Sequence, residues 1–326
     1  MNILEIKDLK IYYETLQGVV KAVDGIDFIV KKGTSVGLAG ESGCGKTTFG
    51  LSLLKLLPEN GTIQGGSVHF EEQDIYSISE DEFRENVRWK EISMVFQGAM
   101  NAMNPVFKVE DQISEAIKLH DKKVRRKEAR EKARNLLKIV DIDATMGSHY
   151  PHEFSGGMRQ RAMIAMALAC NPQLVIADEP TTALDVIVQK QLMDLLFKLK
   201  KDLDLSLIVI SHDISVLAEL CDYLNIMYAG RIVEWGEIHD IFNNSQHHYT
   251  HGLISSFPTV HDIDRIRKFE YIPGSPPNLI DPPLGCRFHP RCSAATNICR
   301  QEPSPKLTKI HGNHYVACHH PRGEKV

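Results

Sequence analysis

The sequence of 326 residues has no apolar run of 18 or more residues, the length that a membrane-spanning helix needs. We therefore expect that the chain itself does not cross a membrane. Its opening residues, MNILEIKDLK, alternate apolar and charged side chains and lack the apolar core of a secretory signal peptide, which predicts a cytosolic location. The formal net charge of -4 lacks the basic excess typical of nucleic-acid binders, so no nucleic-acid partner is expected.

Cysteine is scarce, with seven residues in all, and no C-x2-C pair, the usual signal of a zinc site, occurs among them. Three are scattered along the chain: Cys44, Cys170 and Cys221. The other four crowd into its last part: Cys286, Cys292, Cys299 and Cys318. In a cytosolic protein such a cluster holds a metal more often than it forms a disulfide framework.

Apolar residues make up 43% of the chain and charged residues 25%, which is typical of globular proteins. A chain of 326 residues exceeds the size at which single cores stop growing, so two domains are expected. Beyond about Gly236, proline and glycine become frequent and the apolar periodicity fades, above all in residues 273–285. This change predicts a second, smaller and loop-rich domain.

Short apolar runs alternate with helical patterns before that point. Strands are predicted at 3–7, 20–30, 35–39, 174–177 and 207–210, and helices at 48–57, 121–141, 158–169 and 186–201. Such alternation predicts an α/β fold with a largely parallel sheet covered on both faces. The helix at 121–141 has a basic face, typical of a solvated helix with an anionic partner as the alternative. Its opposite, apolar face consists of Ala129, Ala133, Leu136, Leu137 and Val140.

Residues 40–47, GESGCGKT, match the pattern G-x-x-x-x-G-K-[ST] at every fixed position. The match lies between a predicted strand and a predicted helix, where glycines let backbone N–H groups turn toward phosphate oxygens. Lys46 should reach the β- and γ-phosphates of a nucleotide, and Thr47 should offer its hydroxyl to Mg²⁺. The expected contact residues of this phosphate loop are Ser42, Gly43, Cys44, Gly45, Lys46, Thr47 and Thr48.

Polar residues follow three of the apolar strands. Asp178 and Glu179 follow residues 174–177, at the end of a strand where open α/β sheets bind ligands. Asp178 is placed to bind Mg²⁺, and Glu179 to polarise the attacking water as a general base. Gln97 and His212 end two other apolar runs in the same way, so we expect both beside the γ-phosphate.

Residues 155–161, SGGMRQR, resemble the signature motif of ATP-binding cassette (ABC) ATPases, with Met158 where many members carry glutamine. Ser155, Gly156 and Gly157 open a predicted helix and so form a second surface suited to phosphate. In this family one nucleotide is bound between the phosphate loop of one subunit and the signature of another. The resemblance therefore implies ATP-driven dimerisation with a partner cassette.

The other marks of the family occur in the same order along the chain. Asp185 ends the sequence ALD, which resembles the D-loop that crosses the dimer interface, while Gln97 matches the Q-loop and His212 the switch histidine. Tyr13 is the expected aromatic that stacks on adenine, with Tyr12 as the alternative. The Mg²⁺ ligands expected from the resemblance are Thr47, Gln97 and Asp178.

The resemblance implies an ABC-type P-loop NTPase over residues 1–240, with a RecA-like parallel core, an antiparallel β subdomain and a helical signature subdomain at about 108–170. Only one phosphate loop is present, unlike in tandem-cassette translation factors. Only about 110 residues without sustained heptads separate it from the signature, unlike in chromosome-maintenance ATPases. What remains is a transporter subunit whose membrane-spanning parts are separate chains.

The last part of the chain resembles the C-terminal extension of oligopeptide and dipeptide importer ATPases. The resemblance rests on residues 248–253, 272–277 and 285–292, and on residues 96–106 near the Q-loop. It implies an extension domain at 241–326. Some members of this subfamily import nickel or other small solutes, which stay open as alternative cargo.

In this subfamily the spacing C-x5-C-x6-C-x18-C is associated with a 4Fe–4S cluster. The four clustered cysteines match it position by position: Cys286, Cys292, Cys299 and Cys318. The alternatives are free thiols or a zinc ion assisted by a nearby histidine, and the candidates for that role are His289, His314, His319 and His320.

We therefore expect an ATP-hydrolysing subunit of a multi-chain peptide importer, bound peripherally to the cytoplasmic face of the cell membrane. The partners implied are a homologous or identical second cassette, two transmembrane permeases and, indirectly, an extracytoplasmic solute-binding protein. Two rivals from other classes remain: a soluble ATPase without a transport role, and a metal-sensing interaction protein in which the nucleotide is secondary.

Overall fold

The computed structural model describes residues 1–98, 102–256 and 272–323, and the chain divides into two compact units. Unit 1 comprises Met1–Ile3, Val30–Ser35 and Glu72–Ile210. Unit 2 comprises Leu4–Ile29, Val36–Glu71 and Ser211–Val326. Of the stretches that carried the family resemblance, 96–106 includes residues 99–101, which lie outside the described residues. The same holds for 257–271 and 324–326 within the expected extension.

Unit 1 contains three parallel strands in the order β8-β7-β6. They are β6 (Ile92–Val95), β7 (Leu174–Asp178) and β8 (Ser206–Ser211), and every residue in them is buried. Continuous burial is what a parallel sheet covered on both faces requires, as the near-continuous apolar runs predicted. The short strand β5 (Gln73–Asp74) and the helix α2 (Glu80–Asn86) precede them.

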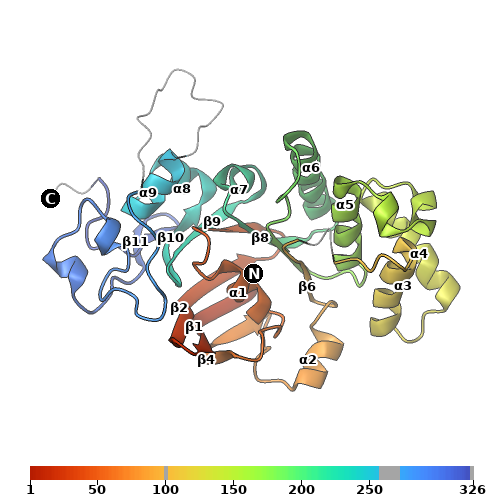
Figure 1. The fold of residues 1–326 in the computed structure, drawn as a ribbon, viewed down its shortest axis with the longest axis horizontal. Coiled ribbons are helices and arrows are strands. Elements are labelled where there is room, and N and C mark those ends of the chain that lie inside the picture. The colour runs from red at the N-terminus through yellow and green to blue at the C-terminus, as the bar shows by residue number, and fades with distance from the viewer. Residues whose placement is uncertain (99–101, 257–271, 324–326) are drawn as a thin grey trace. The chain divides into compact units, whose positions relative to one another are not determined.

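The helical part of unit 1 consists of α3 (Val109–His120), α4 (Arg126–Ile139) and α5 (Gly156–Ala167), which pack on one another (Figure 1). The helix α6 (Val186–Asp202) follows β7. Two short 3-10 segments, Ala144–Ser148 and Pro151–Glu153, lead into α5. The predicted apolar face of α4 is confirmed, because all five of its residues are buried.

The helix predicted at 121–141 begins five residues later, at Arg126. The cause is a turn, in which the Asp121 carboxylate accepts a hydrogen bond from the backbone N–H of Lys123 at 3.1 Å. Ion pairs then join α4 to α3: Arg134 Nε lies 2.6 Å from Glu110, and Arg130 Nη2 lies 2.6 Å from Asp111. Two basic side chains of α4, Arg130 and Arg134, therefore form ion pairs within unit 1.

Unit 2 contains an antiparallel sheet in the order β2-β1-β4, coloured red to orange in Figure 1. Its strands are β1 (Asn2–Thr15), β2 (Gly18–Lys31) and β4 (Gly61–Phe70). Both N-terminal strands are longer than predicted, because the hairpin between them turns only at residues 16–17. This is the antiparallel β subdomain that the family resemblance implied.

A second sheet of unit 2 has the order β11-β12-β10-β9-β3, in which β3 and β9 are parallel. The strands are β3 (Ser35–Ala39), β9 (Tyr223–Tyr228), β10 (Arg231–Glu237), β11 (Thr308–His311) and β12 (His314–Val316). The helices are α1 (Lys46–Ser52), α7 (Ile214–Leu220), α8 (Ile238–Asn243) and α9 (His248–Ser255). The late hairpin β11–β12 thus extends the sheet through β10.

The helix predicted at 48–57 is shorter than expected, because α1 ends at Ser52. Lys55 takes a left-handed conformation with φ 51°, and the backbone N–H of Leu56 returns to the carbonyl of Leu51 at 3.0 Å. This turn lets Leu53 and Leu54 bury their side chains completely. Tertiary burial therefore ends the helix before Pro58 does.

Candidate functional site: a phosphate loop and a carboxylate pair

The phosphate loop in unit 2 requires glycine at two of its positions. A Cβ atom on Gly40 would lie 2.2 Å from the carbonyl oxygen of Met227, and one on Gly45 would lie 2.0 Å from that of Ala22. Both residues also have positive φ, 157° and 108°. The backbone of the loop therefore packs against its neighbours at distances that only glycine allows, which fixes its shape.

Lys46 lies inside this loop, with 6% of its surface exposed. Its Nζ donates hydrogen bonds to the carbonyl oxygens of Gly40 at 2.8 Å and Glu41 at 3.0 Å. The following Thr47 and Thr48 are partly exposed, as is Gly45, while Ser42 and Gly43 are exposed. The loop thus presents hydroxyl and backbone groups around a fixed ammonium group.

Tyr13, rather than Tyr12, lies beside this loop. Its hydroxyl donates to Thr48 Oγ1 at 3.1 Å, whereas Tyr12 donates to the Asp24 carboxylate at 2.6 Å. Cys44 is buried, and burial raises the pKa of its thiol. A protonated thiol is a weak nucleophile, in keeping with the absence of a predicted redox role.

The same loop is bound by the C-terminal part of unit 2. Arg291 makes a bidentate ion pair with the Glu41 carboxylate, with nitrogen–oxygen distances of 2.6 and 2.9 Å. The backbone N–H of Glu41 donates to the hydroxyl of Tyr249 at 2.9 Å. Arg287, four residues before Arg291, binds Asp24 and the carbonyl of Ala229. The sequence pattern predicted none of these contacts, because their partners are 58 to 263 residues apart in the chain.

In unit 1 the predicted carboxylate pair follows β7. Asp178 is fully buried at the end of the strand. Glu179 has a left-handed backbone with φ 48°, a rare conformation for a non-glycine residue and one that is common at functional sites. Its Oε2 accepts hydrogen bonds from Gln97 Nε2 at 3.0 Å and from Thr182 Oγ1 at 2.9 Å. Gln97 was predicted to lie here, whereas Thr182 was not.

The serine of the signature caps the helix α5 in unit 1. Ser155 Oγ accepts from the backbone N–H of Met158 at 3.2 Å, and a Cβ on Gly157 would lie 2.6 Å from the side chain of Val188. Ser155 is exposed, while Gly156 and Gly157 are partly exposed.

The D-loop aspartate also caps a helix. The Asp185 carboxylate accepts from the N–H groups of Ile187 and Val188 at the start of α6, at 3.1 and 3.0 Å. His212 directly follows β8 and is exposed in unit 2. The predicted site residues therefore belong to both units: the phosphate loop, Tyr13 and His212 to unit 2, and the others to unit 1, namely Gln97, Ser155, Gly156, Gly157, Asp178, Glu179 and Asp185.

Family models match two parts of the chain. Residues 23–182 match a model described as ABC transporter, and residues 233–299 match the oligopeptide/dipeptide transporter C-terminal region. The chain is 44% identical to the oligopeptide transport ATP-binding protein OppD of Bacillus subtilis over 330 residues, which cover 100% of this chain and 91% of OppD. It is 42% identical to OppD of Escherichia coli, covering 98% and 93% of the two chains. It is 41% identical to the dipeptide transport ATP-binding protein DppD of Caldanaerobacter subterraneus, covering 97% and 96%.

The chain belongs to this family of ABC transporter ATP-binding proteins. It is an ABC ATPase that couples ATP hydrolysis to transport, and an ATP-binding subunit of the oligopeptide/dipeptide type. Among solved structures, the dimeric ATP-binding cassette MJ0796 in a post-hydrolysis state with ADP and Pi matches with a TM-score of 0.65 and 26% identity, over 72% of this chain and 98% of that one. CbiO1 of Clostridium perfringens, part of the transporter complex cbiONQ, matches with a TM-score of 0.64 and 27% identity, over 74% and 91%.

The four clustered cysteines of this ABC ATPase line one small cavity of unit 2. Burial raises the pKa of the Cys286 thiol to about 11 and that of Cys318 to about 12, and the three neighbouring sulfurs add to the rise at Cys318. Backbone N–H groups face the sulfurs, among them that of His320, which donates to Cys318 Sγ at 3.4 Å. The histidines on the cavity wall are His247, His248, His289, His319 and His320.

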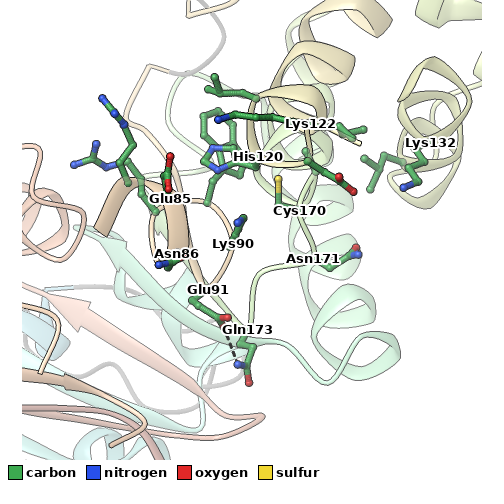
Figure 2. Close-up of a pocket in the computed structure, with 18 of the residues that line it drawn as sticks. Glu85, Asn86, Lys90, Glu91, His120, Lys122, Lys132, Cys170, Asn171 and Gln173 are labelled. Carbon is green, nitrogen blue, oxygen red and sulfur yellow. Dashed lines mark hydrogen bonds between the residues drawn. The ribbon is translucent and has the colours of Figure 1, made fainter. Parts of the chain in front are cut away.

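Unit 1 has a groove of about 1550 Å³ lined by α2 and the segment after it, the end of α3, α4, and the segment between α5 and β7. In Figure 2, Cys170 lies between His120 and Lys132, and Glu91 lies beside Gln173, whose Nε2 donates to the Glu91 carboxylate at 2.8 Å. The cationic residues that line it are Arg84, Arg88, Lys90, Lys122, Lys123 and Lys132, against the acidic Glu85, Glu91 and Asp121. Burial, followed by the charges of Lys90 and Arg88, lowers the pKa of His120. The lining therefore has more cationic than anionic side chains, and three of the cations, Arg84, Arg88 and Lys132, pair with carboxylates outside it.

Within the residues that the structure describes, no helix combines the length and the hydropathy needed to cross a membrane. The names of the relatives contain the words oligopeptide transport and dipeptide transport.

Proposed function

We propose that this chain is the ATP-hydrolysing subunit of a peptide importer at the cytoplasmic face of the cell membrane, with a cassette at residues 1–240 and an extension at 241–326. The observation that carries the proposal is the full-length match to OppD proteins together with the separate match of residues 233–299 to the oligopeptide/dipeptide C-terminal region. A similarity confined to the cassette would have left the cargo open.

The chemistry follows from the side chains in each unit. Lys46 binds the β- and γ-phosphates of ATP, and Tyr13 stacks on the adenine. Mg²⁺, with Thr47, Gln97 and Asp178 as its protein contacts, supplies charge neutralisation at the phosphates. Glu179 accepts a proton from the attacking water, and the hydrogen bonds from Gln97 and Thr182 orient its carboxylate.

A second cassette, identical or homologous, completes the site. The start of α5 presents the hydroxyl of Ser155 and the N–H groups of Gly156 and Gly157 to the nucleotide of the partner. His212 contacts the γ-phosphate, and Asp185 lies in the D-loop at the dimer interface. Beside Asp185, the apolar residues Val186 and Ile187 are 82% and 71% exposed. Apolar side chains exposed to this degree on neighbouring positions suit a contact with another protein. The dimeric structure of the similar cassette MJ0796 supports this arrangement.

The groove of unit 1 is proposed to receive a cytoplasmic segment of a permease subunit. The excess of cationic side chains in its lining favours an acidic segment, and Leu119, 66% exposed on its wall, offers an apolar contact. Two permeases and, through them, an extracytoplasmic solute-binding protein complete the transporter. The chain itself then needs no membrane-spanning helix.

Peptide import is tested in the native host with Lys46→Ala, which removes the ammonium group from the phosphate loop. Uptake of a labelled tripeptide should fall to background, because ATP no longer drives the cycle, while uptake of ⁶³Ni²⁺ stays unchanged. Lys201→Ala, an exposed lysine on α6, is the matched control and should transport normally. Loss of nickel uptake alone would assign the nickel alternative, and unchanged uptake of both would favour the ATPase without a transport role.

We further propose that the extension binds a 4Fe–4S cluster through Cys286, Cys292, Cys299 and Cys318. All four thiols face one cavity, and thiolates are the ligands that such clusters use. A tetrahedral zinc ion would bring the sulfurs to about 3.8 Å from one another, given a Zn–S distance of about 2.3 Å. Among the described residues, no three of these four sulfurs all lie within 4.8 Å of one another. The wider spacing supports a cluster over zinc.

Protein purified without oxygen should therefore contain iron and inorganic sulfide and absorb broadly in the visible range. Cys292→Ser should lose this absorption, because one cluster ligand is gone, while Cys170→Ser, a cysteine outside the cavity, should retain it. One zinc ion per chain without inorganic sulfide would show that the site binds zinc and not an iron–sulfur cluster. Protein with neither metal would leave four free thiols, and burial raises the pKa of three of them, Cys286, Cys292 and Cys318.

A further inference from the structure

Three residues of unit 2 bring possible metal ligands together outside the nucleotide site and the cysteine cavity. Asp240 on α8, His311 at the end of β11 and His314 at the start of β12 each offer one ligand atom, and the three atoms lie within 4.8 Å of one another. His311 Nδ1 lies 3.9 Å from Asp240 Oδ2, too far for a direct hydrogen bond. Two ligands of a tetrahedral ion, each at about 2.0–2.1 Å from it, lie about 3.4 Å apart, so small side-chain shifts would seat an ion between them.

His314 is the buried member of this group of three residues. Its side chain is fully buried, and its Nε2 lies 2.7 Å from Glu234 Oε1. The Glu234 carboxylate also accepts hydrogen bonds from the backbone N–H groups of Gln246 at 2.6 Å and His247 at 2.9 Å. An ionised carboxylate only accepts, so Nε2 of His314 carries the proton and donates it.

In the neutral tautomer that donates from Nε2, the other ring nitrogen of His314 is an acceptor. This Nδ1 is buried and has no hydrogen-bond partner within the described residues. A buried polar atom without a partner costs free energy, and such atoms are rare unless an unseen group satisfies them. A cation bound by His311 and Asp240 would be that group.

We propose that Asp240, His311 and His314 bind one divalent first-row cation of the Zn²⁺ class, with a fourth position open to water. Two imidazoles and one carboxylate form a donor set that suits Zn²⁺ and its neighbours, whereas Mg²⁺ and Ca²⁺ prefer oxygen ligands alone. Glu234 fixes the tautomer and orientation of His314, as carboxylates do behind metal-binding histidines. The donors are nitrogen and oxygen, so the site differs in chemistry from the thiol cavity.

The cation would join elements that are far apart in the sequence. The hairpin β11–β12 is already attached to β10, where Trp235 and Tyr315 stack with ring centroids 4.7 Å apart. Asp240 lies on α8, which directly follows β10. A cation held by Asp240 and both histidines would therefore cross-link the hairpin to α8 and stabilise the C-terminal part of unit 2.

Cobalt titration of the full-length protein tests the site, because cobalt bound by thiolates has a strong near-ultraviolet absorption that cobalt bound by nitrogen and oxygen lacks. Wild type should bind one Co²⁺ without the thiolate band. His311→Ala and Asp240→Asn should each weaken this binding at least tenfold, because each removes a ligand. His239→Ala, an exposed histidine on the same helix, should bind as wild type does. Binding that shows only the thiolate band, or unchanged binding by His311→Ala, would overturn the proposal.

Thermal unfolding separates loss of binding from loss of folding. The His311 side chain is 45% exposed, so His311→Ala should melt at the wild-type temperature in EDTA. Added Zn²⁺ should raise the melting temperature of wild type and His239→Ala, since a ligand of the folded state stabilises it, but not that of His311→Ala. An equal shift in all three proteins would contradict the proposed ligands.

Discussion

Replacing Glu179 with glutamine should lower ATP turnover by about 10²- to 10⁴-fold, the range over which general-base catalysis contributes. The variant keeps the size of the side chain and an oxygen that can accept the hydrogen bond from Gln97. It loses the carboxylate that takes the proton from water. Steady-state phosphate release at saturating MgATP measures the effect.

The same variant should bind ATP and remain dimeric with it, since binding and hydrolysis use different groups. Gel filtration with MgATP should show a dimer for Glu179→Gln and less of it for wild type, which consumes the nucleotide. Thr182→Val is the matched control: it removes the other hydrogen bond to the same oxygen but leaves the carboxylate, so its turnover should fall less than tenfold. Wild-type turnover from Glu179→Gln would refute the assignment of the base.

The sequence was sufficient to predict the elements whose signal is local. The strand β7 is a run of apolar residues ending in acids, and the structure buries all five residues of it. The phosphate loop is a pattern of fixed spacing, and its two fixed glycines, Gly40 and Gly45, lie where a Cβ atom would collide with backbone. Strands with a local apolar pattern, and loops whose backbone requires glycine, can thus be predicted without knowledge of the tertiary structure.

The choice between Tyr13 and Tyr12 could not be made from the sequence. The pairing of β1 with β4 shifts register between Lys7 and Lys10 and again between Lys10 and Ile11. Each such irregularity can exchange the faces on which the following side chains lie, so alternation in the sequence does not tell which tyrosine faces the loop. Sequence reasoning likewise missed Thr182 and the contacts of Glu41, which depend on tertiary geometry.

Arg291→Ala should have the largest effect of any change in the extension. The Arg291 side chain is 7% exposed, pairs with Glu41 and also donates from Nε to the carbonyl of Pro273 at 2.7 Å. Its removal leaves a largely buried carboxylate without its counter-charge, which costs about 3–5 kcal/mol of folding free energy in comparable pairs. The loss should appear as a lower temperature of thermal unfolding, and Arg300→Ala, an exposed arginine nearby, should melt as wild type does.

ATP binding should weaken in the same variant, because Glu41 belongs to the phosphate loop and its carbonyl accepts a hydrogen bond from Lys46. A loss of about 1–2 kcal/mol would raise the dissociation constant about 5- to 30-fold, measurable with a fluorescent ATP analogue. A double-mutant cycle of Arg291→Ala with Glu41→Gln measures the coupling between the two side chains. Glu41 is 250 residues from Arg291 in the chain, so Glu41→Gln leaves the backbone next to Cys292 unchanged. If the two single changes add without coupling, or if Arg291→Ala binds ATP as Arg300→Ala does, the extension does not act on the nucleotide site through this ion pair.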